Sequence, residues 1–171
     1  MKKLDHRGFT LTELIVVIAI IGILAGVASA SINQIFSNQA RKFINECDAM
    51  LTRCRIETLS GAPDGTRVVL RCDLNDGKYY VTLYKGAGIT NKLDEEQLKG
   101  NTASCSYTTA EGTTDTLDQG ESLEIRYNRV TGAMEPKPAN PEVTDTRCTE
   151  INISGQKITL VPATGYHKVG G

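Results

Sequence analysis

The feature that most constrains this chain is a long uncharged segment near its N-terminus. Residues 14–30 contain no Asp, Glu, Lys or Arg, and the next charged residue is Arg41. An apolar run of this length can span a bilayer as a helix. Lys2, Lys3 and Arg7 precede the run, and a basic flank of this kind stays in the cytoplasm. We therefore expect a single membrane pass, with the N-terminus inside and the rest of the chain outside.

Glu13 is an exception to the apolar character of this segment. A carboxylate inside the hydrocarbon of a membrane is unfavourable unless it is neutralised or paired, so a functional role is the default interpretation. No basic residue follows Glu13 within one helical turn, and Arg7 lies six residues before it. We therefore expect the partner of Glu13 on another molecule.

An ordinary secretory signal peptide is one interpretation of this N-terminus. A basic start and an apolar core lead to the small residues Ala28, Ser29 and Ala30, which form a cleavage site of the A-x-A type. An acidic residue within the apolar core works against plain export, so Glu13 disfavours this interpretation.

The segment from Gly8 to Glu13, G-F-T-L-T-E, supports a second interpretation because it resembles the type IV prepilin motif. The basic eight-residue leader, the junction with Phe9, and a helix that contains Gly22 and Gly26 also match. The resemblance implies that a prepilin peptidase cuts after Gly8 and that Phe9 becomes the N-methylated first residue. Glu13 is then the fifth residue of the mature chain.

The resemblance divides the chain into a cleaved leader (1–8), a membrane-spanning and fibre-core half of the helix (9–32), and an exterior pilin domain (33–171). It also implies that Glu13 meets the free amine of Phe9 in a neighbouring subunit during assembly. The implied partners are other pilin subunits, the peptidase, a membrane platform protein and a cytoplasmic assembly ATPase. No cofactor is expected.

An amphipathic helix is predicted over residues 33–60, as the second half of one long helix. Six apolar positions recur at alternating spacings of four and three, which is typical of a face that packs on a core; they are Phe36, Ala40, Phe43, Cys47, Met50 and Cys54, and Ile44 and Leu51 lie beside them. The helix should end near Gly61 and Pro63. Several pilins carry a kinking Pro late in this helix, but here no Pro precedes Pro63.

Strands are expected from residue 67 onward, where the apolar period changes to two. Residues 67–74 and 79–84 alternate around the turn residues Asn75, Asp76 and Gly77, which predicts a hairpin. The D-x-N-D-G run in this turn lacks the glycine position and the bidentate Glu of a calcium loop, so we interpret it as a turn.

The middle of the chain has weaker signals. Residues 93–99 could form a short helix with Asp94 near its start. Residues 100–120 are rich in Thr, Ser, Gly and Asp and are predicted to form a surface loop, apart from a candidate edge strand at 104–108.

The C-terminal part returns to strand periodicity. Residues 122–128 alternate, a turn follows up to Gly132, and Pro136–Pro141 breaks regular structure. A last hairpin is predicted from 149–153 and 157–161, followed by a turn at 163–165. The predicted fold class is therefore α+β, with a long N-terminal helix packed on an antiparallel sheet within residues 67–170, as in pilins.

Five cysteines would lie in the exported domain, where disulfides persist, and an odd number leaves at least one unpaired. Cys47 and Cys54 are seven residues apart, so their Cα atoms would be ~10.5 Å apart on a helix, too far for a bond. If the first strand runs back along the helix, Cys72 comes level with Cys47, which predicts a Cys47–Cys72 bond. The pilin resemblance instead suggests Cys105 with Cys148, closing a C-terminal loop.

Metal binding, catalysis and nucleic-acid binding are disfavoured. The chain has no C-x-x-C pair, and its only histidines are His6, in the leader, and His167, which we predict to be a solvated tail residue. No nucleophile and base set or phosphate loop is recognisable. Beyond the leader and Glu13, 16 basic and 18 acidic residues give no basic footprint for nucleic acid.

The sequence therefore predicts a non-enzymatic structural subunit of a type IV pilus, held in the cytoplasmic membrane and then polymerised into an extracellular fibre. A pseudopilin of a type II secretion or competence DNA-uptake system, which uses the same signal and helix in a shorter fibre, is the alternative. A membrane-anchored binding domain is a third hypothesis.

Overall fold

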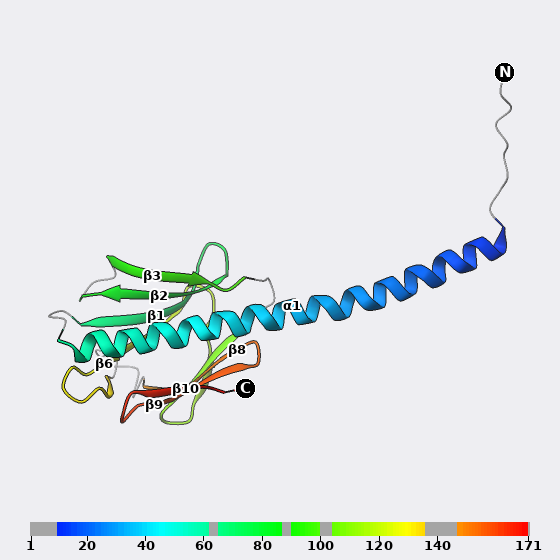
Figure 1. Ribbon diagram of the computed structural model, residues 1–171. Coiled ribbons are helices and arrows are strands. Elements are labelled where there is room, and N and C mark those ends of the chain that lie inside the picture. The colour runs from blue at the N-terminus through cyan, green and yellow to red at the C-terminus, as the bar shows by residue number, and fades with distance from the viewer. Residues whose placement is uncertain (1–9, 62–64, 87–89, 100–103, 136–146, 171) are drawn as a thin grey trace, which may run out of the picture. The chain divides into compact units, whose positions relative to one another are not determined.

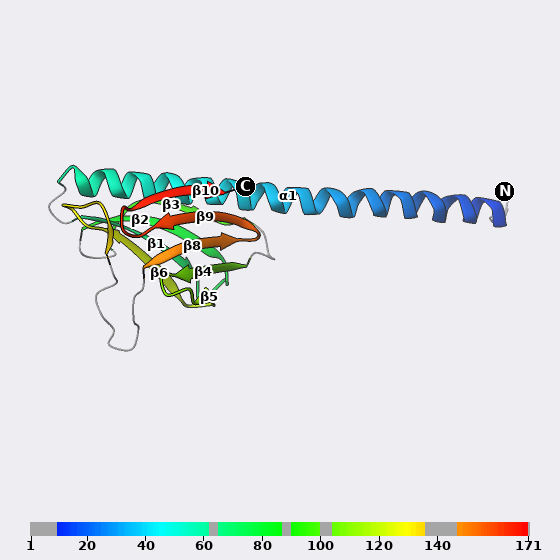
Figure 2. The same ribbon diagram turned by 90° about the horizontal axis from the view of Figure 1, so that it is seen from below.

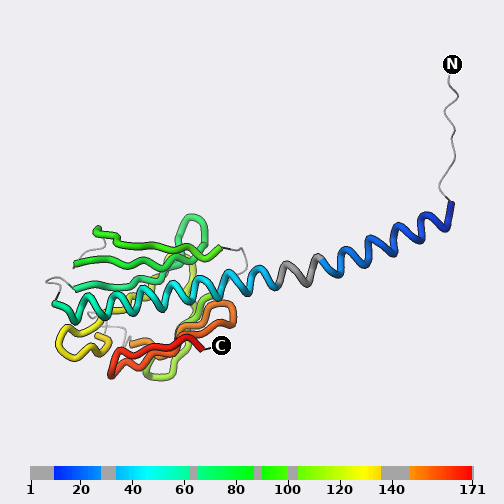
Figure 3. The backbone as a smooth tube through the Cα atoms, in the orientation of Figure 1, coloured from blue at the N-terminus to red at the C-terminus, as the bar shows by residue number. Residues whose placement is uncertain are grey.

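The computed structural model describes residues 10–61, 65–86, 90–99, 104–135 and 147–170, and the side chains of residues 28–33 are excluded from this description. The chain divides into two units, Met1–Phe36 and Ser37–Gly171. The helix α1 (Leu11–Leu59) continues from the first unit into the second (Figures 1 and 3). Within the described residues, no helix meets the length and apolarity needed to cross a membrane.

Two five-stranded antiparallel sheets form the second unit together with the later part of α1. The first, sheet A, has the strand order β3-β2-β1-β6-β7, and the second, sheet B, has the order β10-β9-β8-β4-β5. The strands are β1 (Thr66–Cys72), β2 (Tyr79–Lys85), β3 (Asn91–Gln97), β4 (Cys105–Thr109), β5 (Thr114–Thr116), β6 (Ser122–Tyr127), β7 (Met134–Glu135), β8 (Cys148–Ile153), β9 (Gln156–Val161) and β10 (Tyr166–Gly170).

The helix lies between the edge strands β3 and β10, one from each sheet (Figures 1 and 2). Lys42 pairs with Glu96 of β3 at 3.2 Å, while Thr52 contacts His167 of β10 at 2.9 Å. The far edge of sheet A is also tied to sheet B, because Met134 N–H donates to the Pro162 carbonyl at 2.8 Å. Both sheets therefore share one core with the helix.

The predicted apolar stripe of the helix is confirmed over most of its length. Buried positions on α1 recur at the predicted spacing; they are Ala40, Phe43, Ile44, Cys47, Met50, Leu51 and Cys54. All of these except Ala40 join the inward residues of both sheets in one cluster. Phe36 is different, because its side chain is 39% exposed. The helix ends at Leu59, and Gly61 follows with a positive φ of 93°, a conformation that favours glycine after a helix. Pro63 lies outside the described residues.

Three predicted turns and their strands are confirmed. β1 and β2 pair from Thr66↔Lys85 to Cys72↔Tyr79, which gives the hairpin predicted around residues 75–77. β8 and β9 form the last hairpin, with Ser154 and Gly155 both at positive φ between them. In the turn after β6, Gly132 N–H donates to the Asn128 carbonyl at 2.8 Å.

Other predictions were wrong, and the fold has two sheets instead of one. Residues 93–99 are not helical, because most of them belong to β3, where Gln97 pairs with Tyr80 of β2. Their polar sequence has no period, so pairing with a neighbouring strand decides their structure. β5 lies inside the predicted loop, and it makes β4 an inner strand between β5 and β8 and not an edge. The prediction also missed β10, while Pro136–Pro141 falls outside the described residues.

Candidate functional site

The start of α1 is organised by reciprocal hydrogen bonds between Thr10 and Glu13. Thr10 N–H and the Thr10 hydroxyl each donate to Glu13 Oε2 at 2.9 Å, and Glu13 N–H donates to Thr10 Oγ1 at 3.3 Å. This is a capping box, in which a Thr and a Glu three residues later satisfy the free N–H groups at a helix N-terminus. Leu14 N–H donates to the Thr10 carbonyl at 3.2 Å and so begins the helix.

The capping box gives Glu13 a hydrogen-bond partner within its own chain, and pairing with another molecule stays a prediction. We expected its partner on another molecule, yet within the single chain its carboxylate is already bound by Thr10. The signal was present in the sequence as the T-x-x-E spacing from Thr10 to Glu13. Hydrogen bonding by Thr10 leaves the negative charge of Glu13 without an opposite charge among the described residues. Gly8 and Phe9 lie outside those residues.

An apolar surface surrounds the helix in the residues after Glu13. Every large apolar side chain described from residue 11 to residue 27 is exposed, by 47–75%; these are Leu11, Leu14, Ile15, Val16, Val17, Ile18, Ile20, Ile21, Ile23, Leu24 and Val27. Full burial of one such side chain contributes roughly 1.5–3 kcal/mol. Soluble single chains rarely expose an apolar surface of this extent, which is typical of an interaction site.

Two glycines interrupt this apolar surface four residues apart. A Cβ added at Gly22 or Gly26 would meet no atom within 4 Å. The spacing G-x-x-x-G lets the backbone of another helix approach closely. The segment is therefore suited to packing among apolar helices.

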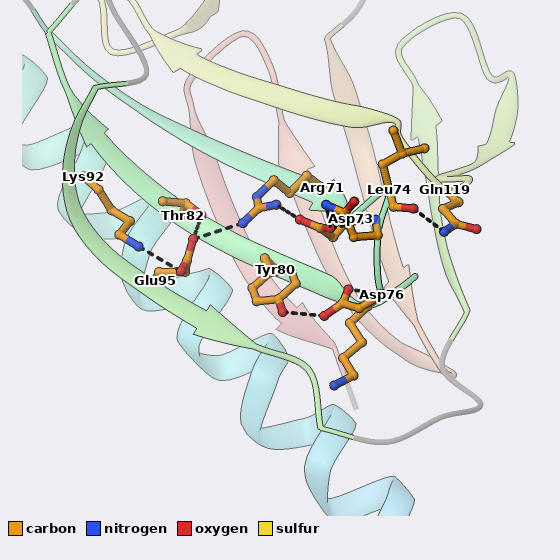
Figure 4. Close-up of polar contacts among 11 residues, drawn as sticks. Arg71, Asp73, Leu74, Asp76, Tyr80, Thr82, Lys92, Glu95 and Gln119 are labelled. Carbon is orange, nitrogen blue, oxygen red and sulfur yellow. Dashed lines mark hydrogen bonds and ion pairs between the residues drawn. The ribbon is translucent and has the colours of Figure 1, made fainter.

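The outer face of sheet A carries a second group of polar residues (Figure 4), and its charges are paired. Glu95 accepts from Lys92 at 3.0 Å and Thr82 at 3.0 Å, and lies 3.3 Å from Arg71. Burial raises the pKa of Glu95, but the hydrogen bonds from these three side chains outweigh it, so the net pKa is lowered. The lowered pKa and the three donors make the Glu95 carboxylate a weak base, so it is unsuited to act as a general base. The group joins β1, β2 and β3.

The turn before β2 satisfies its own carboxylates. Asp73 Oδ1 accepts from Asn75 N–H, and Asp76 Oδ1 accepts from Lys78 N–H, both at 2.9 Å. Asp76 also accepts the Tyr80 hydroxyl at 2.8 Å, as Figure 4 shows. These are the side-chain to backbone bonds of an Asx turn, which support turn chemistry over a calcium loop.

All five cysteines are buried as free thiols, so the structure contains neither predicted disulfide. The register of sheet B also separates Cys105 from Cys148, because Cys148 lies opposite Thr109. Four residues of strand span ~13 Å, whereas disulfide-linked Cα atoms are within about 7 Å. The Cys105–Cys148 pairing is therefore incompatible with this register. The Cys47–Cys72 bond is not formed here and stays a prediction for the oxidised protein.

His167 is not the solvated tail residue that the sequence suggested. It lies in β10, with its side chain only 8% exposed against α1. Nε2 is 2.9 Å from Thr52 Oγ1 and 3.6 Å from Asp48 Oδ1, and Nδ1 is 3.4 Å from the Gly165 carbonyl oxygen. His167 thus holds the last strand on the helix and has a structural role.

Comparison with known proteins bears directly on the N-terminal segment. The prokaryotic N-terminal methylation motif matches residues 3–29, which include Glu13 and the exposed apolar surface. This segment is the class III signal of type IV pilins and pseudopilins. The pilins that carry this signal are structural subunits. The signal implies processing by a prepilin peptidase and assembly from a membrane-anchored state into pili. No solved structure matches the chain.

Proposed function

We propose that the protein is a structural subunit of a type IV pilus, cut after Gly8, methylated at Phe9 and polymerised through the first half of α1. The observation that carries the proposal is the methylation motif over residues 3–29, together with the first part of α1, where the large apolar side chains of residues 11–27 are exposed on all sides. Such a helix must be covered by lipid or by other helices. A fibre of identical subunits provides that cover after the chain leaves the membrane.

Before assembly, the subunit is held in the cytoplasmic membrane by residues 9–32, with its N-terminus inside. The uncharged run of residues 14–30 and the basic leader support this orientation. Assembly then uses a membrane platform protein and a cytoplasmic ATPase, and the finished fibre is extracellular.

Glu13 provides the specificity of assembly. Cleavage creates a free amine on Phe9, and in the fibre the carboxylate of Glu13 pairs with the amine of a neighbouring subunit. A buried carboxylate and ammonium neutralise each other, whereas either one alone is strongly unfavourable in an apolar environment. Because the amine exists only after cleavage, unprocessed subunits are kept out of the fibre.

Electron microscopy of cells with and without the gene tests the proposal, with the N-terminus of the protein sequenced from sheared surface material. Long filaments that disappear with the gene and contain this chain starting at methylated Phe9 are expected. Correct processing without long filaments would favour a pseudopilin of a secretion or DNA-uptake system. An uncut Gly8–Phe9 bond would reject both and favour a membrane-anchored binding domain.

A further inference from the structure

The end of β8 carries an acceptor sequence for N-linked glycosylation that the pilin role does not require. Residues Glu150 to Ser154 read E-I-N-I-S, so Asn152 is followed two positions later by Ser154, and Ile153 between them is not Pro. The N-x-S pattern is the acceptor for glycosylation of Asn in exported proteins. A three-residue pattern also occurs by chance, so the structure around Asn152 must show whether the pattern can serve as an acceptor.

Asn152 points away from the core of the second unit. Its neighbours Ile151 and Ile153 are 2% and 0% exposed, and successive side chains of a strand point to opposite faces. Across the sheet, Asn152 lies opposite Ser106 of β4 and Lys157 of β9. A sugar on Asn152 would therefore extend from the outer face of sheet B, beside a short hydroxyl and a flexible amine.

Two groups of the acceptor, the Nδ2 group of Asn152 and the hydroxyl of Ser154, make no hydrogen bond within the described residues. Asn152 Oδ1 accepts from Gly155 N–H at 3.0 Å, but within the described residues its Nδ2 group makes no hydrogen bond. Ser154 is exposed, and although its N–H donates to the Ser104 carbonyl at 2.9 Å, its hydroxyl has no hydrogen bond in the same part of the chain. An enzyme can thus bind the Ser154 hydroxyl and the Asn152 Nδ2 group without breaking a hydrogen bond of either group.

The backbone of Ser154 gives an independent reason to look for a function. Its φ is 50°, which makes it the one non-glycine residue with positive φ in the described segments. It occupies the first position of the two-residue turn Ser154–Gly155, where Asn, Asp and Gly are preferred because they tolerate this conformation. Strained residues of this kind often mark functional sites. Replacing Ser with one of the preferred residues would relax the turn but would remove the hydroxyl that the acceptor needs.

We propose that Asn152 is an N-glycosylation site and that the donor is an oligosaccharide linked to a lipid pyrophosphate. In the transfer, a bond forms between Asn152 Nδ2 and C1 of the first sugar, the bond from C1 to the pyrophosphate oxygen breaks, and the proton that the amide loses is taken up by the departing pyrophosphate. The lipid pyrophosphate is the leaving group. The catalyst is a membrane oligosaccharyltransferase that acts on the exported face, so the proposal rests on the export in the proposed function.

Peptide mapping of the protein from the cells that naturally make it tests this site. Trypsin cuts after Arg147 and Lys157 and releases residues 148–157, which contain Asn152 as their only Asn. Mass spectrometry with fragmentation that keeps sugars attached should locate a glycan on Asn152. An unmodified Asn152, or a sugar on Ser154 instead, would overturn the proposal.

Three variants separate the acceptor chemistry from folding. Asn152→Gln should abolish the modification, and Ser154→Thr, which keeps a hydroxyl, should retain it. Ser154→Gly relaxes the turn and removes the hydroxyl, so loss of the glycan in this variant cannot come from a damaged hairpin. A glycan retained by Ser154→Gly would overturn the proposed acceptor. N-terminal sequencing of the same samples tests the pilin proposal separately. An uncut leader contradicts that proposal whether or not Asn152 carries a glycan.

Discussion

Substitutions at Thr10 and Glu13 can separate the helix cap seen in the structure from the charge pairing that we propose for assembly. Glu13→Ala removes both the capping hydrogen bonds and the charge. Glu13→Gln keeps an oxygen that can accept from Thr10 N–H but removes the charge. Thr10→Val, similar in shape, removes the capping hydroxyl and leaves the charge. If charge pairing drives assembly, the two Glu13 variants should fail while Thr10→Val assembles.

The magnitudes of the two effects differ enough to be distinguished. Loss of a helix cap costs about 1 kcal/mol, which corresponds to roughly a fivefold change in an equilibrium constant. Removing one partner from a buried ion pair costs about 3–5 kcal/mol, or roughly 150- to 5,000-fold for each contact. The folded domain should not respond to any of the three, because Ala40, the first buried residue of the described chain, lies 27 residues after Glu13.

Each variant should be expressed in place of the wild type, with fibres counted by electron microscopy. Membrane level and N-terminal sequence provide the controls, since a fibre defect is informative only for correctly processed protein. Normal filaments made of processed Glu13→Ala subunits would refute charge pairing. Loss of filaments in Thr10→Val as complete as in Glu13→Ala would show that the helix cap, and not the charge, limits assembly.

Three further predictions concern processing and the folded domain. Intact mass of fibre material should show methylated Phe9 as the first residue, and a start at Ser31 would contradict the pilin interpretation. Glu124→Ala should lower the free energy of unfolding by about 3 kcal/mol, because Arg67, 3.0 Å away and only 6% exposed in its side chain, would lose its buried partner. Glu96→Ala, which breaks an exposed pair, is the matched control and should cost less than about 1 kcal/mol in the same denaturant titration. Finally, after mild reduction the five thiols of the native protein should resist labelling by iodoacetamide at pH 8. Burial raises the pKa of all five thiols, to about 11 or 12 for three of them, and so keeps them protonated. Rapid labelling before unfolding would contradict their burial.

Several elements could be predicted from the sequence because their signals are local. The apolar stripe of α1 and the hairpins of β1–β2 and β8–β9 follow from periodicity and turn residues, and the structure confirms them. The methylation motif is also local, since a peptidase reads it in the linear chain. The capping box could also have been predicted from the T-x-x-E spacing of Thr10 and Glu13, but we considered only charged partners for Glu13.

The tertiary structure decided what depends on distant partners. β3 has one apolar residue, Leu93, in a polar segment, so only pairing with β2 makes it a strand. His167 resembled a tail residue until β10 placed it against Thr52 of the helix. The Cys105–Cys148 pairing looked reasonable as a loop closure, but the β4–β8 register sets those residues too far apart.

The sequence by itself thus determined the signal, the helix and the local hairpins, because neighbouring residues encode a methylation motif, an amphipathic face or a tight turn. The division of the strands between two sheets is different. It depends on which parts of the two sheets meet across the core, as where the hydroxyl of Tyr79 in β2 of sheet A donates to the carbonyl of Leu117, just after β5 of sheet B, at 3.2 Å. Strands of both sheets carry the same period of two, and that period does not specify a partner. Only the burial of both inner faces against one helix selects the pairing.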